Sequence, residues 1–285
     1  MKKFIDIKNL EFRYGNQSKL LSDLNLEIET GRIHGLLGKN GEGKSTLLKL
    51  ISGLLFPING EIKVLDFVPG KRYPKMLQGI FFLPEEAPGS NLSIKKFVKT
   101  YAPFYPKFRL SKFYDYINDF GIDPLTANIN TMSYGQKKKF MIAFGLGTNT
   151  KVILMDEPTN GLDIPSKGIF RKIVKSVINE NCTVIISSHQ VLDLENLIDK
   201  IMIMEDHQIV FNETTEDILK KLYFTVGDST KTDETVIYTE DTLRGLSQVC
   251  ENTLGKESNL DVEVLFNAVI TQPENIKKVF GKTNE

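Results

Sequence analysis

The feature that most constrains this chain is a loop of spaced glycines between an apolar run and a helical pattern. Residues 38–45 read GKNGEGKS, Leu36 and Leu37 precede them, and a leucine-rich stretch follows. Spaced glycines let backbone N–H groups converge on a phosphate, and the following helix adds the positive end of its dipole. Lys44 can neutralise terminal phosphates, and Ser45 can offer its hydroxyl to Mg²⁺. The loop predicts a site for a nucleoside triphosphate with magnesium.

A pair of carboxylates follows a short apolar run, Val152 to Met155. Such a run suits a strand that is buried on both faces, so the acids stand where the strand ends. Asp156 can hold magnesium, directly or through water, and Glu157 can polarise the water that attacks a γ-phosphate. An isolated Asp-Glu-Pro would more simply end a strand. Its coexistence with the glycine loop favours phosphate chemistry.

A third pattern is the start of a helix at Ser133-Tyr134-Gly135-Gln136, which a basic and then apolar stretch continues. Ser133 fits a helix N-cap, which leaves free backbone amides beside it. Residues 160–163 read NGLD, and residues 187–189 read SSH after another apolar run. In this order the patterns resemble those of ATP-binding-cassette ATPases, over roughly residues 4 to 212.

The resemblance implies an α/β fold, that of a P-loop NTPase with a RecA-like core. The core would carry an antiparallel β subdomain and a helical subdomain at about 87–145 that holds the signature. Strands and helices that alternate from Ile33 onward independently indicate a largely parallel sheet covered by helices. We expect a cassette at 1–212 and a small α+β accessory domain at 213–285. Two strands, 223–226 and 235–238, and a helix with apolar residues at 262, 265, 266 and 269 are expected there, for packing or dimerisation.

The resemblance also assigns site residues in two cassettes arranged head to tail. Phosphates and magnesium would be bound within one chain by Gly38, Asn40, Gly41, Gly43, Lys44, Ser45 and Thr46, with Asp156 on the metal. Ser133, Gly135 and Gln136 would face the γ-phosphate held by the partner cassette. Glu157 would be the general base, and His189 would contact the γ-phosphate and the attacking water. Asp163 would communicate across the dimer interface, while His34 and His207 are expected to be structural.

Three positions leave alternatives open. Tyr14 stands where related cassettes stack an aromatic ring on adenine, but it could equally be a turn aromatic without a ligand. Glu85 stands at the family's glutamine loop and would contact magnesium or its water. It could instead belong to a solvated acidic turn, or Glu86 could fill that place. Tyr134 replaces the glycine that the family most often has in the signature, which adds bulk there.

Composition narrows the class of protein. The 36 basic residues balance 36 acidic ones, so no overall field steers the chain toward nucleic acid. The two cysteines have no metal-ligand spacing, and no apolar run approaches the roughly 18 residues of a membrane-spanning helix. We expect a cytoplasmic protein, peripheral at the inner face of the membrane, whose partners are a second cassette and an integral membrane permease.

The leading interpretation is the ATPase subunit of a transporter, resembling the single-cassette subunits of bacterial multidrug, bacteriocin and sodium exporters. The Leu-Pro-Glu form of the glutamine loop favours export by analogy. The alternative is a soluble single-cassette ATPase of an assembly machine, of the iron–sulfur cluster type. A nucleotide kinase or GTPase would leave the signature and His189 without a role. Aromatic residues at 97–120 are expected mainly in a core, and exposed ones at an interface with the membrane subunit.

Overall fold

A mixed six-stranded sheet forms the centre of the molecule in this computed structural model, which describes residues 3–86, 90–124, 127–226, 236–242 and 245–281. The strand order is β5-β6-β7-β3-β8-β9. The strands are β3 (Ile33–Gly38), β5 (Ile80–Leu83), β6 (Val152–Asp156), β7 (Thr183–Ser188), β8 (Lys200–Glu205) and β9 (Gln208–Thr214). Neighbours from β5 to β8 are parallel, and only β9 runs antiparallel. The predicted largely parallel sheet is confirmed.

Alternate residues of each central strand enter two different cores, because successive side chains of a strand point to opposite faces. In β6, Ile153 and Met155 belong to one apolar cluster, and Val152 and Leu154 belong to the other. Both faces are therefore covered, which explains why these strands read as unbroken apolar runs.

One face is covered by α1 (Lys44–Ile51) and a three-stranded antiparallel sheet in the order β2-β1-β4. Its strands are β1 (Lys3–Phe12), β2 (Leu21–Glu29) and β4 (Asn59–Val64). Polar and buried residues alternate along β2, as in a strand with one wet face. This confirms the predicted antiparallel layer at the N-terminal end of the chain. A short turn η1 (Pro69–Lys71) and α2 (Pro74–Leu77) then lead into β5.

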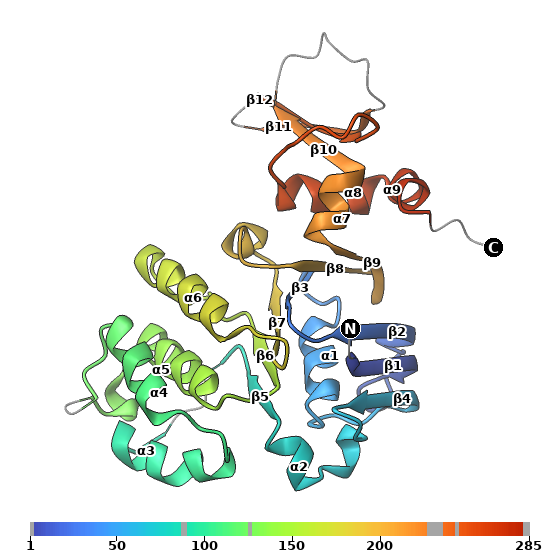
Figure 1. Cartoon of the computed structure of the whole chain (residues 1–285). Coiled ribbons are helices and arrows are strands. Elements are labelled where there is room, and N and C mark those ends of the chain that lie inside the picture. The colour runs from blue at the N-terminus through green and yellow to red at the C-terminus, as the bar shows by residue number, and fades with distance from the viewer. Residues whose placement is uncertain (1–2, 87–89, 125–126, 227–235, 243–244, 282–285) are drawn as a thin grey trace.

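A group of helices packs beside the opposite face of the sheet (Figure 1). It comprises α3 (Ile94–Tyr101), η2 (Ala102–Phe104), α4 (Leu110–Asp119), η3 (Ile129–Thr131), α5 (Tyr134–Gly147) and α6 (Ile164–Val177). A helical segment was expected at 87–145, of which residues 87–89 and 125–126 lie outside the described ones; α5 continues to Gly147, and α6 joins the group from beyond that range. Most of its aromatic residues are buried together, and Phe97 packs edge-to-face on Phe140 and Phe144. Tyr101 and Phe104 are exposed.

The C-terminal elements lie at the end of the molecule opposite α2 and α3 (Figure 1). After η4 (Val191–Leu194) and β9 come α7 (Thr215–Lys221), β10 (Leu222–Val226), β11 (Val236–Thr242), β12 (Gly245–Glu251), α8 (Val262–Thr271) and α9 (Pro273–Val279). The three strands form an antiparallel sheet in the order β10-β12-β11. Two of these strands were expected, although Thr235, the expected start of the second, lies outside the described residues; β12 was not expected.

The C-terminal elements share a core with the cassette. Leu265 and Val269 of α8 are buried, as the helical spacing predicted, and belong to the same apolar cluster as Leu194 and Ile201. Strand β9 also continues to Thr214, across the expected boundary at 212/213. None of the helices in the described part of the chain is long and apolar enough to cross a membrane.

Candidate nucleotide site

The glycine loop connects the end of β3 to the first residue of α1, as its sequence predicted. Gly43 caps α1 with φ of 105°, and Gly41 has φ of 92°, a region that favours glycine. A Cβ on Gly38 would lie 2.6 Å from the carbonyl oxygen of Met204 on β8. Glycine therefore lets the loop turn, and it lets β3 approach β8 closely.

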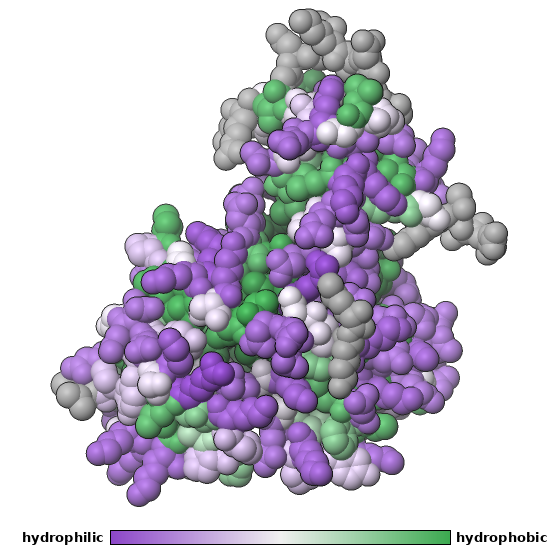
Figure 2. Space-filling view, in the orientation of Figure 1, coloured by the Kyte–Doolittle hydropathy of each residue, from purple (hydrophilic) through white to green (hydrophobic). Residues whose placement is uncertain are grey.

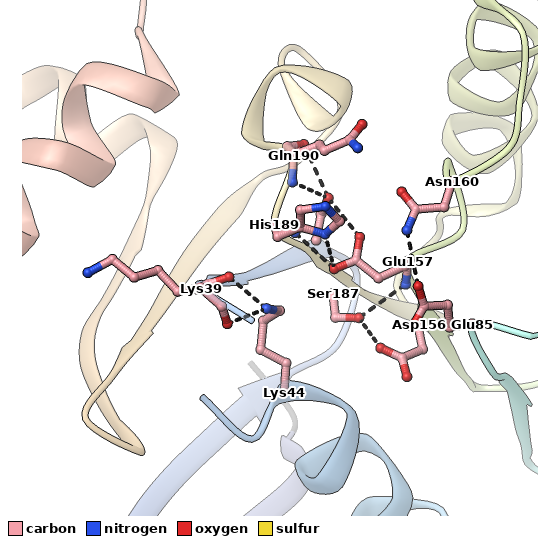
Figure 3. Close-up of polar contacts among 11 residues, drawn as sticks. Lys39, Lys44, Glu85, Asp156, Glu157, Asn160, Ser187, His189 and Gln190 are labelled. Carbon is pink, nitrogen blue, oxygen red and sulfur yellow. Dashed lines mark hydrogen bonds and ion pairs between the residues drawn. The ribbon is translucent and has the colours of Figure 1, made fainter. Parts of the chain in front are cut away.

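Lys44 points back over this loop (Figure 3). Its Nζ donates to the carbonyl oxygens of Gly38 at 2.6 Å and Lys39 at 2.9 Å. An ammonium has three donors, so these two bonds leave one for an anion. Burial lowers the pKa of Lys44, and the carboxylates of Glu157 and Asp156 oppose that shift. The loop thus holds a positive charge at the start of α1, where the helix dipole also favours an anion.

The carboxylate pair occupies the end of β6, as expected. Asp156 and Glu157 are both buried. The Ser187 hydroxyl on β7 donates to Asp156 Oδ1 at 2.6 Å. The backbone N–H of Glu157 is 3.2 Å from the Ser187 hydroxyl and 3.2 Å from its carbonyl oxygen. Glu157 has φ of 44°, an uncommon conformation for a residue with a side chain, and such strained residues concentrate at functional sites.

Glu157 and His189 contact each other directly (Figure 3). The Nδ1 atom of His189 lies 2.8 Å from Glu157 Oε1, and the backbone N–H of His189 donates to the same oxygen at 2.9 Å. The Ser188 hydroxyl donates to Glu157 Oε2 at 3.3 Å. Both carboxylate oxygens therefore have partners that fix their direction. The structure brings together two residues that sequence analysis had assigned to the same chemistry.

Ser187 and Ser188 are the site residues that sequence reasoning missed. They were noted only as neighbours of His189. Asp156 pairs with Ser187 across the parallel strands β6 and β7, which places the serines beside both carboxylates. The available signal was two hydroxyl residues at the end of an apolar strand. The order of strands in the sheet, which decides what they face, was not readable from their positions in the chain.

A cavity of about 340 Å³ collects most of the predicted phosphate and catalytic residues. It is lined by Leu20, Asn40, Gly41, Gly43, Lys44, Ser45, Thr46, Glu85, Glu157 and His189. Backbone amides, an ammonium and a hydroxyl suit phosphates, and the oxygens of Ser45, Asp156 and Glu85 are ligands of the kind that Mg²⁺ takes. The residues present therefore fit a nucleoside triphosphate with a magnesium ion.

Glu85 belongs to this cavity, whereas the exposed Glu86 is not among its lining residues. One carboxylate oxygen of Glu85 accepts from Asn160 Nδ2 at 3.2 Å, and its carbonyl oxygen accepts from the Tyr134 hydroxyl at 3.0 Å. These contacts favour Glu85 over Glu86 for the place of the glutamine loop. Glu85 is itself exposed, so its role at the metal stays a prediction.

The predicted signature residues lie outside the cavity lining. Ser133 caps α5: its hydroxyl accepts from the Gln136 N–H at 3.2 Å, and the Gln136 side chain accepts from the Ser133 N–H at 3.0 Å. The predicted cap is confirmed. A Cβ on Gly135 would lie 2.7 Å from the carbonyl oxygen of Gly161, so α5 closely approaches the loop after β6.

Asp163 and Tyr14 also have partners within the chain. Asp163 caps α6 and pairs with Lys139 at 3.2 Å. A hydrogen bond from Ser166, with help from Lys139, lowers the pKa of Asp163 to about 2. The Tyr14 hydroxyl lies 3.0 Å from the Thr46 hydroxyl, and its ring packs edge-on against Phe12. Part of the Tyr14 ring remains exposed beside the loop.

The two histidines expected to be structural do pack as such. His34 is buried, its Nε2 lies 3.2 Å from the Glu29 carbonyl oxygen, and burial lowers its pKa to about 4. His207 stands on the β8–β9 turn, where its backbone N–H donates to Glu42 at 3.0 Å and its Nδ1 lies 3.0 Å from the Glu42 carbonyl oxygen. It thereby supports the glycine loop from outside the cavity.

Comparisons with known proteins agree with this geometry. A family profile described as "ABC transporter" matches residues 21–160. The ABC transporter ATP-binding protein YtrB of Bacillus subtilis is 32% identical over 82% of this chain and 79% of its own length. The bacitracin transport ATP-binding protein BcrA of Bacillus licheniformis is 30% identical over 81% of this chain and 78% of its own length.

Solved structures show the same fold. The ATP-binding subunit of an ABC transporter superimposes with a TM-score of 0.67 at 22% identity, over 75% of this chain and 91% of that one. The cassette MJ0796, in a dimeric post-hydrolysis state with ADP and phosphate, gives 0.63 at 23% identity, over 74% of this chain and 98% of that one. The relatives' names also favour the transporter interpretation over the soluble assembly ATPase. This chain belongs to the ATP-binding proteins of ABC transporters and is an ATPase of that family.

Proposed function

We propose that this chain hydrolyses MgATP in a site shared by two cassettes, and thereby powers a separate membrane subunit that exports its substrate. The observation that carries the proposal is the contact of Glu157 with His189 at the edge of the cavity that also holds Lys44. A base, a histidine and an ammonium around one phosphate-sized space are what γ-phosphate hydrolysis requires.

Each of these side chains has a task that its contacts support. Glu157 accepts the proton of the attacking water, and the hydrogen bonds from His189 and Ser188 hold its carboxylate toward the cavity. Lys44 donates its third N–H to a phosphate and offsets the charge that collects on the leaving group. Ser45 and Asp156, with Glu85 nearby, would hold the magnesium ion, which would supply charge neutralisation to the phosphates.

The second half of the site comes from the start of α5 in another cassette. Ser133 and Gln136 are exposed, lie outside the cavity of their own chain, and have an N-terminal helix dipole behind them. The Ser133 hydroxyl accepts a hydrogen bond in the capping box, so its own proton stays available to a phosphate oxygen. Binding of ATP between the two cassettes closes the dimer, and hydrolysis reopens it.

The membrane subunit docks at the end of the molecule that carries α2 and α3. Tyr101, Phe104 and Leu110 are exposed on consecutive elements there, and Phe56 and Tyr73 are exposed on the segments that flank η1 and α2. Figure 2 shows apolar residues at this end among largely hydrophilic surroundings. A cluster of exposed large apolar side chains favours a protein interface. We propose that docking there holds the chain at the cytoplasmic face of the membrane.

Export is supported by the kinds of relatives found. One is named a bacitracin transport protein, and another, SrtF of Streptococcus pyogenes, is named a lantibiotic transport ATP-binding protein and is 30% identical over 73% of this chain and 90% of its own length. Each name states a transported compound, bacitracin or a lantibiotic. We infer that an amphipathic or peptide-like compound is the class of substrate.

The test is co-purification from detergent-solubilised membranes of the native host, with tagged Glu157→Gln protein and MgATP. A polytopic membrane protein should be recovered. Phe104→Asp should reduce its recovery by about tenfold or more, since an aromatic side chain that the interface would bury is lost. Leu254→Asp, at an exposed apolar residue of the C-terminal elements, is the matched control. Recovery of soluble proteins alone, or equal loss with both variants, contradicts the proposal.

A further inference from the structure

A buried lysine stands close to the cavity without an assigned role. Lys138 of α5 has 0% of its surface exposed, and no carboxylate lies within ion-pair distance of it among the described residues. A buried ammonium is costly unless polar partners compensate it. Its neighbours Lys137 and Lys139 are half-exposed, so the burial is particular to this position.

The partner of Lys138 is the main chain of Glu85. Its Nζ donates to the Glu85 carbonyl oxygen, and the Tyr134 hydroxyl donates to the same oxygen at 3.0 Å. Tyr134 and Lys138 are four residues apart and so share one face of α5, and the ammonium lies 5.8 Å from the centre of the Tyr134 ring. A carbonyl oxygen has two lone pairs, which these two donors use.

The same place joins a third segment. The Glu85 carboxylate accepts from Asn160 Nδ2, and a Cβ on Gly161 would lie 2.6 Å from the Tyr134 ring. The loop after β5, the start of α5 and the loop after β6 therefore meet within one chain. A displacement of the signature end of α5 has to move Glu85 with it.

The charges around Lys138 favour a positive group at this position. Glu85, Asp156 and Glu157 bring three carboxylates to a site that must also accept the phosphates of ATP. Lys44 and a magnesium ion together would still leave a negative excess. Burial lowers the pKa of Lys138, and the negative charges of Glu85, Asp156 and Glu157 oppose that shift. Because the Lys138 ammonium is bonded to the carbonyl oxygen of Glu85 itself, its charge lies beside that residue's carboxylate and offsets part of it, where an amide would need no such compensation.

We propose that Lys138 is a positioning residue for ATP hydrolysis, which with Tyr134 fixes Glu85 to α5 and compensates the Glu85 carboxylate beside the nucleotide. This rests on the proposed function only for the role of Glu85 at the metal. The link itself exists without nucleotide.

The first test therefore needs no nucleotide. Lys138→Met removes the charge and keeps the length of the side chain, and Tyr134→Phe removes only the hydroxyl. Amide hydrogen exchange at residues 85 and 86 should accelerate by about tenfold in Lys138→Met and less in Tyr134→Phe, because each change removes one of the two anchors. Lys137→Gln, a matched change on an exposed lysine, should leave exchange unchanged. Unchanged exchange in Lys138→Met overturns the proposed link.

The second test is a double-mutant cycle on ATP hydrolysis and on MgATP binding. Lys138→Gln should lower kcat by about tenfold while changing KM less than threefold, because it disturbs position and not uniform binding. Adding Glu85→Gln should restore kcat to within about threefold of the Glu85→Gln protein, since the uncompensated carboxylate is gone. Purely additive losses overturn the charge compensation.

The two tests separate the possible failures. If Lys138→Gln does not fold, Tyr134→Phe replaces it in the double-mutant cycle with Glu85→Gln, because loss of a hydroxyl spares the fold. The coupling energy between these two changes should then be smaller. If hydrolysis proves insensitive to Glu157→Gln, the proposed function fails while the exchange result still decides the link. If hydrolysis depends on Glu157 and the cycle is additive, Lys138 does not compensate the Glu85 carboxylate, and an unchanged kcat in Lys138→Gln overturns its positioning role.

Discussion

The phosphate cavity and the signature end of α5 are two helix starts with opposite surroundings. In the cavity, the start of α1 faces a buried lysine and two buried carboxylates that are tied to serine and histidine. At α5, Ser133 and Gln136 are exposed, and the side chain of each accepts a hydrogen bond from the backbone N–H of the other. Both ends present backbone amides and a favourable dipole to an anion.

The difference shows that a helix start alone is not a catalytic site. The cavity has the charges needed to move a proton and to hold phosphates, whereas the signature end offers only donors. In the proposed function, the signature end therefore acts on a phosphate that another chain holds. Within one chain the two regions are joined through Glu85, which lines the cavity and bonds to α5.

The largest expected effect is on the cavity side. Glu157→Gln should reduce hydrolysis by about 10²- to 10⁴-fold, the usual contribution of a general base, because an amide accepts no proton. Binding of a fluorescent ATP analogue should persist, since Lys44 and the glycine loop are intact. The rate of hydrolysis is measured by phosphate release. Glu86→Gln, outside the cavity lining, is the control, and normal turnover of Glu157→Gln would refute the assignment.

A smaller effect is expected on the signature side. Ser133→Ala should lower hydrolysis by about tenfold through loss of one hydrogen bond to the transferred phosphate. ATP binding by the isolated chain should be unchanged, because Ser133 lies outside its cavity. The lost cap should also lower the free energy of unfolding by about 1 kcal/mol, measured by urea denaturation. Ser133→Thr, which retains a hydroxyl, should preserve most of both. Weaker ATP binding by the isolated Ser133→Ala chain would break the contrast between the two regions.

Substitutions at Tyr14 test whether the site also binds the adenine ring of ATP. Tyr14→Ala should weaken ATP binding by about 1 kcal/mol, or roughly fivefold, if the ring stacks on adenine. Tyr14→Phe keeps the ring and loses only the hydroxyl contact with Thr46. Equal affinities of the wild-type and Tyr14→Ala proteins would mean that the ring is only a turn aromatic.

The smallest effect concerns Asp163, which joins α6 to α5 through Lys139. Its pKa is lowered to about 2, mainly by hydrogen bonding from Ser166. The ionised form is therefore the one that the fold favours. The stabilisation of the fold by ionised Asp163 is complete above the ordinary pKa of 3.8. It is lost as pH falls toward 2. Asp163→Asn should be slightly less stable than wild type at pH 7, and this difference should shrink below pH 4. A difference independent of pH would contradict this origin.

The sequence allowed correct predictions where the residues that form a feature are neighbours in the chain. The glycine loop, the Ser133 cap and the acids after the apolar strand depend on residues that are neighbours in the chain, so their patterns could be read directly. The buried runs also predicted the parallel sheet, because strands covered on both faces need apolar residues at every position.

Sequence reasoning was weak where function depends on which strands are neighbours. Ser187 reaches Asp156 only because β6 and β7 are adjacent, and Lys138 reaches Glu85 only through the packing of α5 beside β5. Strand β12 was missed because alternation of half-buried residues gives it a weak signal. The link between the two regions is thus tertiary in origin.

The most direct test of the account is the mass of the Glu157→Gln protein by light scattering, with and without MgATP. The chain has a mass of 32.3 kDa, and MgATP should double it, because each cavity needs the signature end of a second chain. The same measurement with Ser133→Ala added should show weaker association. A protein that binds ATP stoichiometrically and retains the mass of one chain would contradict the shared site.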